Sequence, residues 1–218
     1  MISLIGSLAD NKSALGRRYG EWAVSAPTIE SAVAAAAMAQ DELGHARSTY
    51  PVLAKLGVSQ SEEAGLDKGH PLPVISSELP DWASVIAANL VVDGVLTTFV
   101  ASARNSSIEP LAQRARKILQ EEGAHRVHAE AWARRIVGVG GGDLGLLIQR
   151  IDEMWASAAR WPGPDSDPGY RAAVAAGMVN EGPAEIRGRV RIWLRKLVPA
   201  VVLEDPTDWS DWDPQRRQ

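Results

Sequence analysis

The chain carries one short motif twice, and this repeat limits the folds open to it more than any other feature. Asp41-Glu42-Leu43-Gly44-His45 and Glu121-Glu122-Gly123-Ala124-His125 each lie deep in an alanine-rich stretch with helical periodicity. Each motif belongs to a predicted helix that follows a short turn and a preceding helix. Two hairpins of matching design predict a four-helix bundle with pseudo-two-fold symmetry.

Capping and turn residues set the expected ends of the helices. Thr28 is a predicted N-cap of the second helix, and Asp81 of the third. The expected helices cover 8–24, 29–55, 81–104, 110–137, 143–161, 170–179 and 183–197. A long loop is expected at 57–80 because that stretch is rich in Pro, Gly and Ser. The sequence therefore predicts an all-α fold.

We expect a single helical domain over residues 1–218. Its core bundle should cover 8–138 and its C-terminal helices 143–197. The last stretch, 198–218, contains Trp209 and Trp212 among aspartates and reads as an irregular tail that docks by its tryptophans. With 45% hydrophobic residues in 218, the chain can fill a core of this size, which excludes wholesale disorder.

The composition also excludes several kinds of reactive site and of binding partner. The absence of cysteine excludes disulfides, thiol nucleophiles and iron–sulfur clusters, so any metal would be held by nitrogen and oxygen. The net charge of −4 argues against nucleic-acid binding. The apolar run 83–101 is long enough to span a membrane, but Asn89 and Asp93 lie in its middle. A central helix of a bundle without a membrane span is predicted, and a cytoplasmic protein is expected.

The repeated motif has a specific chemical meaning. Glu-x-x-His places a carboxylate and an imidazole on one helix face, about one turn apart. Two such helices, with one acid from each remaining helix, supply the ligand set of di-iron and di-manganese carboxylate bundles. The alternative is a pair of exposed ion-pair faces. The apolar surroundings of both motifs favour the metal interpretation.

The geometry of the hairpin turns indicates which acids would complete the set. In an antiparallel hairpin, residues equally far from the turn face each other, so Glu122 should face the region of Asp93. Asp93 is the only charge in its apolar stretch. A buried lone carboxylate is costly without a partner. Asp93 is therefore a predicted ligand, with a hydrogen-bonded structural aspartate as the alternative.

In the first hairpin, the same construction finds no acid. The position facing Glu42 lies near Asn11 or Lys12, and Lys12 occupies the expected ligand position. Asp10 is the nearest acid, but it points about 200° away around the helix. A lysine at this position could neutralise the remaining carboxylates without a metal.

These residues resemble the ferritin-like subunits of the phenylacetyl-CoA epoxidase family, with features of two subunits mixed. The segments Leu8-Ala9-Asp10-Asn11, Gly20-Glu21-Trp22 and Ala26-Pro27 look like the catalytically silent structural subunit. The segments 26–46, Val92-Asp93-Gly94 and 121–125 look like the catalytic subunit. The similarity covers roughly residues 8–137, and it implies a ferritin-like bundle.

The resemblance also implies a ligand set, a cofactor and partners. The implied iron ligands are Glu42, His45, Asp93, Glu122 and His125. An intact centre would hold two irons and act as an oxidoreductase, a monooxygenase that forms an epoxide on an aromatic acyl-CoA. Its electrons would come from a separate reductase. The expected assembly is a homodimer or a complex with a homologous subunit.

Lys12 is where this chain departs from the family. The catalytic subunits have a glutamate there, so either one metal is lost, or water or Asp10 substitutes, or Lys12 makes the site metal-free. Three functions stay open: a di-iron oxygenase component, a silent structural subunit, and a ferritin-like metal-binding protein with another substrate.

Several neighbouring residues have two interpretations. His128, one turn beyond His125, is either a supporting group or a partly exposed histidine, and the second is favoured. Glu121 and Asp41 point about 100° away from the ligand glutamates, as surface or supporting acids. The arginine-rich stretch 183–197 could attract a coenzyme A phosphate, but a solvated face or a partner for the acidic tail is preferred.

Overall fold

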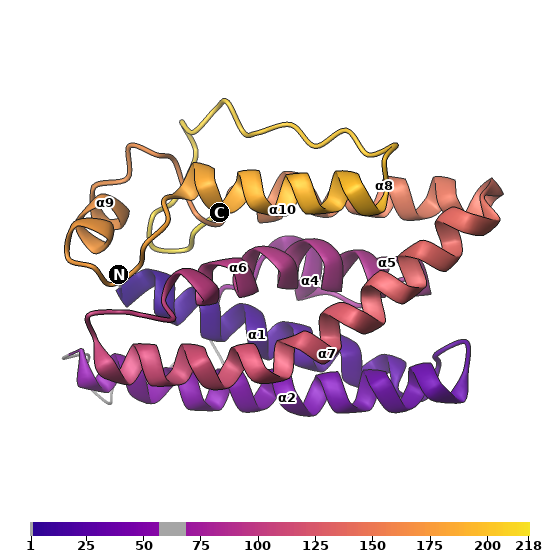
Figure 1. Cartoon of the computed structure of the whole chain (residues 1–218), viewed down its shortest axis with the longest axis horizontal. Coiled ribbons are helices and arrows are strands. Elements are labelled where there is room, and N and C mark those ends of the chain that lie inside the picture. The colour runs from indigo at the N-terminus through magenta and orange to yellow at the C-terminus, as the bar shows by residue number, and fades with distance from the viewer. Residues whose placement is uncertain (1, 57–68) are drawn as a thin grey trace.

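The computed structural model describes residues 2–56 and 69–218, and within them it contains helices and connecting segments but no strand. The predicted all-α fold is confirmed (Figure 1). The helices are α1 (Ile2–Trp22), α2 (Ile29–Lys55), α4 (Pro73–Ser76), α5 (Trp82–Ala87), η2 (Ala88–Asp93), α6 (Gly94–Ser102), α7 (Glu109–Val139), α8 (Gly141–Ala158), α9 (Pro168–Ala175) and α10 (Pro183–Leu197).

The four long helical segments form the bundle that positions the repeated motifs. Helix α1 packs along α2, and α7 contacts both α2 and α6. The segments α5, η2 and α6 follow one another as the third helix of the bundle. Helices α8 and α10 add a second layer, with α8 against α5 and η2 and α10 against α6 (Figure 1). Both motif-bearing helices therefore belong to the bundle and contact each other, each with one buried face.

The third helix explains the long apolar run. Trp82–Ser102 is long and apolar enough to cross a membrane by composition, yet 83% of its most apolar window is buried inside the protein. Its middle, η2, is a π-helix, a widened turn that often marks functional sites. The sequence did not predict this change of helix type. It matters because η2 carries both Asn89 and Asp93.

Helices α1 and α8 begin earlier in the sequence than predicted. Helix α1 begins at Ile2 and not at residue 8, because Leu4, Ile5 and Leu8 extend its buried face. Helix α8 begins at Gly141, directly after the α7 cap Gly140, whose φ of 71° favours glycine. The expected break therefore occupies a single residue.

Other boundaries also differ from the prediction. Helix α7 continues through the first glycine of the run to Val139, and α8 ends at Ala158, ahead of Pro162. Helix α9 covers Pro168–Ala175, and Gly177 with a φ of 66° follows it. Within the expected loop, 73–76 forms the short helix α4. Residues 57–68 of that predicted loop lie outside the described part of the chain.

The predicted cap of α2 is confirmed. The Thr28 hydroxyl oxygen accepts a hydrogen bond of 3.1 Å from the Ser31 backbone N–H. Replacing Thr28 with Ala leaves that N–H without its partner. We expect the free energy of unfolding to fall by about 1 kcal/mol. Urea denaturation followed by circular dichroism measures this, and a Thr28→Ser variant, which keeps the hydroxyl, should lose much less.

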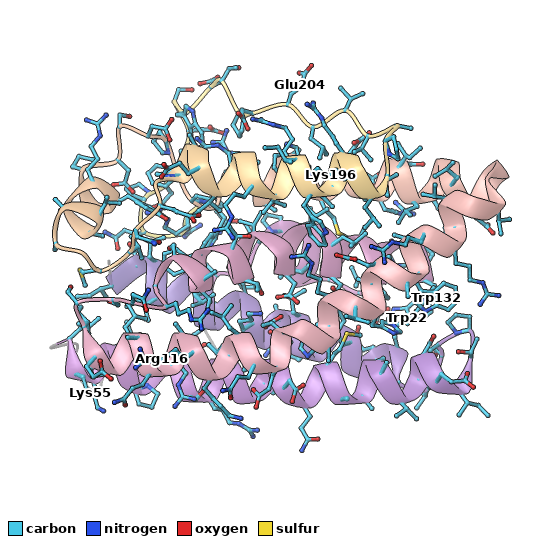
Figure 2. The ribbon with its side chains drawn as sticks, viewed as in Figure 1. Trp22, Lys55, Arg116, Trp132, Lys196 and Glu204 are labelled. Atoms are coloured by element: carbon cyan, nitrogen blue, oxygen red, sulfur yellow. The ribbon has the colours of Figure 1, made fainter. Side chains whose placement is uncertain are left out.

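The acidic tail covers the arginine-rich helix α10. The Asp205 carboxylate lies 2.6 Å from Arg191 and 3.7 Å from Arg187, and the tail backbone accepts a 2.7 Å hydrogen bond from the Trp155 indole at Glu204. Figure 2 shows Glu204 on the tail and Lys196 on α10 below it. The preferred interpretation was a solvated face or a partner for the acidic tail, and the ion pairs of Arg187 and Arg191 with Asp205 support the second of these.

Candidate metal centre

The five predicted ligand residues meet in the middle of the bundle. Glu42 and His45 come from α2, Asp93 from η2, and Glu122 and His125 from α7, and all five are buried. One possible ligand atom from each of Glu42, Asp93, Glu122 and His125 lies within 4.8 Å of the others. The structure therefore brings together, from three helical segments, a group of side chains that could hold a metal ion.

Lys12 occupies the centre of this group. Its side chain is 0% exposed, and its Nζ donates hydrogen bonds to Glu42 Oε1 at 3.1 Å and to Asp93 Oδ1 at 2.5 Å. It also donates to Glu122 Oε1. Position 12 thus faces Glu42, as the turn geometry predicts. We call these six residues, Lys12 with the five predicted ligands, the charge cluster.

The electrostatics of Lys12 follow from this position. Burial alone would lower the pKa of the Lys12 amine, because it penalises the charged form. The three adjacent carboxylates of Asp93, Glu122 and Glu42 outweigh burial and raise that pKa well above its usual value. The side chain is therefore an ammonium that bridges three acids.

The three acids are affected unequally. Burial would raise the pKa of Glu122, but the Lys12 ammonium and the histidines hold it well below its usual value. The pKa of Glu42 is lowered in the same way, against its burial, by Lys12. Asp93 differs: burial and repulsion from the other two carboxylates raise its pKa to about 6, despite Lys12. Asp93 is the acid of the cluster that is hardest to ionise.

The residue preceding each motif glutamate holds the histidine of the other motif. His45 Nε2 lies 2.8 Å from Glu121 Oε2, and His125 Nε2 lies 3.1 Å from Asp41 Oδ2. This crosswise pairing turns both Nδ1 atoms toward the cluster. Asp41 and Glu121 are therefore supporting acids, one of the two roles that the sequence allowed.

The two histidines of the cluster have raised pKa values. Burial would lower the pKa of His45, but its contacts with Glu122 and Glu42 raise that pKa to about 9. The pKa of His125 is raised by Asp93, Glu122 and Glu42 in the same way. Lys12 and the two histidines thus place positive charge against the carboxylates of Glu42, Asp93 and Glu122.

The donor types suit a transition metal, but the position of Lys12 does not. His45 Nδ1, His125 Nδ1 and Glu42 Oε2 are buried, point inward and have no hydrogen-bond partner among the described residues. Once the imidazoles have lost their extra proton, such nitrogen and oxygen atoms are usual ligands of iron and manganese. The Lys12 Nζ, however, occupies the space between the carboxylates that would bridge two metals. The residues do not fit a two-metal centre while Lys12 stays there.

Tyr19 is a member of this region that the sequence analysis missed. Its ring is fully buried, and burial together with the carboxylates of Asp93 and Glu42 raises the pKa of its hydroxyl well above the usual value. Its position could have been predicted from the spacing, because Tyr19 lies seven residues after Lys12 and therefore on the same face of α1.

Two predicted supporting residues lie outside the cluster. Asp10 accepts hydrogen bonds from the Tyr50 hydroxyl at 2.9 Å and from the His70 backbone N–H at 3.2 Å. It does not reach the cluster, so it cannot replace the missing glutamate. His128 is half-buried with its ring edge-on to Trp82, and burial and the neighbouring His125 lower its pKa. The favoured interpretation of His128, a partly exposed histidine, fits this position.

A cavity of about 210 Å³ borders the cluster between α6, α7 and α10. Asp93 and Glu122 form part of its wall, together with Thr97, Arg126 and Trp193. The Thr97 hydroxyl donates to Asp93 Oδ1 at 3.3 Å, so a polar side chain of the cavity touches the cluster directly.

Comparison with known proteins tests the family resemblance that the motifs indicated. A search of curated proteins finds no match. A family model described as phenylacetic acid catabolic protein matches residues 1–218, which is the whole chain. This match confirms the resemblance that the motifs indicated, and it extends that resemblance to the C-terminal helices and tail. The chain belongs to the phenylacetic acid catabolic protein family.

Proposed function

We propose that this protein is a catalytically silent, metal-independent structural subunit of a multicomponent oxygenase of the phenylacetate-catabolic type. The observation that carries the proposal is the Lys12 ammonium, which binds three of the acids that would otherwise hold metal. In this role the charge cluster fixes the bundle, and the oxidation takes place on another subunit.

Lys12 and a metal ion would compete for the same position. A divalent cation between Glu42, Asp93 and Glu122 would lie against the Lys12 ammonium, and like charges at such distances repel strongly in a buried site. Lys12 would have to withdraw, yet its side chain is fully enclosed. The three charge-assisted hydrogen bonds that hold it would be lost as well.

The partners follow from this role. A silent subunit needs a homologous catalytic subunit to bind, and that subunit would take the aromatic acyl-CoA and receive electrons from a separate reductase. A cytoplasmic location belongs to the same proposal. The family supports the general setting of phenylacetate catabolism, while the subunit type is our proposal.

A second candidate function is a di-iron monooxygenase component. The inward-facing Nδ1 atoms of His45 and His125, each with a supporting acid on Nε2, favour it. Bound iron would bind dioxygen and pass to it the electrons that a separate reductase supplies. The ligands would be Glu42 and Glu122 with Asp93 and the two histidines, once Lys12 had moved out. This function needs a rearrangement of α1, and the first does not.

Metal analysis separates the two functions. The purified wild-type protein, loaded anaerobically with ferrous iron and desalted, is expected to retain only traces of metal. Lys12→Glu removes the ammonium and restores the missing carboxylate, and this variant should retain iron and gain thermal stability on loading. Lys196→Glu, the same charge change at an exposed site on α10, should behave as the wild type. Stoichiometric iron in the wild type would overturn the proposal in favour of the oxygenase.

A further inference from the structure

A small groove with basic walls lies between the C-terminal half of α2 and the N-terminal half of α7. It encloses about 190 Å³, and its cationic lining residues are Lys55, Arg114 and Lys117. Ser48 and Gln113 add polar side chains to the same lining. Figure 2 shows Lys55 at this end of the bundle, near Arg116 on α7.

Of the three cations of this groove, Lys117 has a carboxylate partner, Glu121 at 2.6 Å. No carboxylate lines the groove among residues 2–56 and 69–218. Within residues 2–56 and 69–218, no carboxylate oxygen lies in ion-pair distance of Lys55 or Arg114. The Arg114 Nε is buried and has no hydrogen-bond acceptor there. A buried cationic donor without an acceptor is costly, and an anion in the groove would supply that acceptor.

Two prolines form part of the groove wall. Pro51 lies inside α2 and has no N–H, so it cannot bond the carbonyl four residues earlier, which is that of Arg47. Pro110 lies in the first turn of α7, where a proline is well tolerated. Both prolines line the groove, so its wall includes a point of α2 where one helix hydrogen bond is missing.

We propose that this groove binds the phosphate group of a small phosphorylated molecule. Arginine and lysine donors from two helices converge on one concave site, which is the usual chemistry of phosphate recognition. The volume lies below that of pockets that enclose a drug-sized ligand, so it fits the anionic group and not the whole molecule. The proposal is independent of whether the charge cluster holds metal.

The groove is joined to the charge cluster through one shared contact. Lys117 Nζ lies 2.6 Å from Glu121 Oε1, and the other oxygen of Glu121 lies 2.8 Å from His45 Nε2. An anion in the groove would compete with Glu121 for Lys117. Ligand binding at the surface is thereby connected, through two side chains, to a histidine of the cluster.

Calorimetric titration with inorganic phosphate and with pyrophosphate, at constant ionic strength, tests the proposal. We expect saturable binding to the wild-type protein. Arg114→Gln should weaken it by about tenfold or more, because a charge-assisted hydrogen bond is lost. The matched control Lys196→Gln removes a positive charge from α10 and should leave the affinity unchanged. Stronger binding of pyrophosphate would indicate a diphosphate-bearing ligand, and equal binding a phosphomonoester.

A second variant keeps the test decisive even if Arg114→Gln does not fold. Lys55 is exposed and lies at the end of α2, so Lys55→Gln should fold normally and still weaken binding. Circular dichroism establishes that each variant is folded. The proposal is wrong if neither anion binds saturably to the wild type. It is also wrong if Arg114→Gln and Lys55→Gln bind as tightly as Lys196→Gln does.

Discussion

Replacing Lys12 with Leu is expected to lower the free energy of unfolding by about 3–5 kcal/mol at neutral pH. The ammonium lies within hydrogen-bonding distance of Glu42, Asp93 and Glu122, and all four side chains are buried. Its removal leaves an excess of buried negative charge. Urea denaturation of both proteins in the presence of EDTA measures the loss and prevents an adventitious metal from masking it.

The pH dependence of this loss provides an internal check. In the wild-type protein the folded-state pKa of Glu122 is lowered by Lys12, so its contribution to stability is present above its unfolded pKa and is lost as the pH falls through the folded pKa. Without Lys12 the carboxylate pKa values rise, and protonation relieves the repulsion. The difference in unfolding free energy should therefore shrink as the pH falls from about 7 to about 5.

A control separates this effect from a general loss of lysine charge. Lys196→Leu removes an exposed ammonium from α10 and should change the unfolding free energy by no more than about 0.5 kcal/mol. If Lys12→Leu unfolded at the same urea concentration as this control at every pH, the charge cluster would not be a stabilising element.

Replacing Arg217 with Met is expected to lower the free energy of unfolding by about 3 kcal/mol. Although it lies next to the last residue, the Arg217 side chain is only 2% exposed. Its Nη1 donates to Asp167 Oδ2 at 2.8 Å, and its Nε donates to the Trp161 carbonyl at 3.1 Å. The variant leaves the buried Asp167 carboxylate without its cation. Denaturation monitored by tryptophan fluorescence reports both the global transition and the release of the tail.

The neighbouring arginine supplies the control. Arg216 is exposed, and its guanidinium lies 3.7 Å from Asp213, so Arg216→Met should have little effect. The guanidinium of Arg217 also lies over the ring of Trp212, 4.7 Å from its centroid. If both variants unfolded alike, the tail would be anchored by its tryptophans and not by the buried ion pair.

Much of the candidate site could be predicted from residue spacing. The two Glu-x-x-His motifs and the distance from each turn were enough to place Asp93 opposite Glu122 and Lys12 opposite Glu42. This worked because an antiparallel hairpin with a short turn leaves little freedom in register. Asp10 could not be judged in this way. Its partners Tyr50 and His70 come from α2 and from the segment before α4.

Other features depend on tertiary packing, which the local sequence pattern does not predict. The π-helix at Ala88–Asp93 lies within the same apolar run as the α-helical turns beside it, and that run predicts a helix without indicating its type. The start of α1 was missed because its first residues face helices that are distant in the sequence. The crosswise pairing of Asp41 with His125 and of Glu121 with His45 could not be assigned from either motif alone.

By itself, then, the sequence determined an all-helical bundle with five potential metal ligands and a lysine in place of the sixth. Periodicity and turn spacing are local properties, and they are sufficient for that. Only the tertiary structure decided what the lysine does. Whether Lys12 pointed to solvent or bridged three carboxylates depended on how closely α1, α2, η2 and α7 approach one another. Buried carboxylates need a partner of opposite charge, and the Lys12 ammonium is a shared partner of all three.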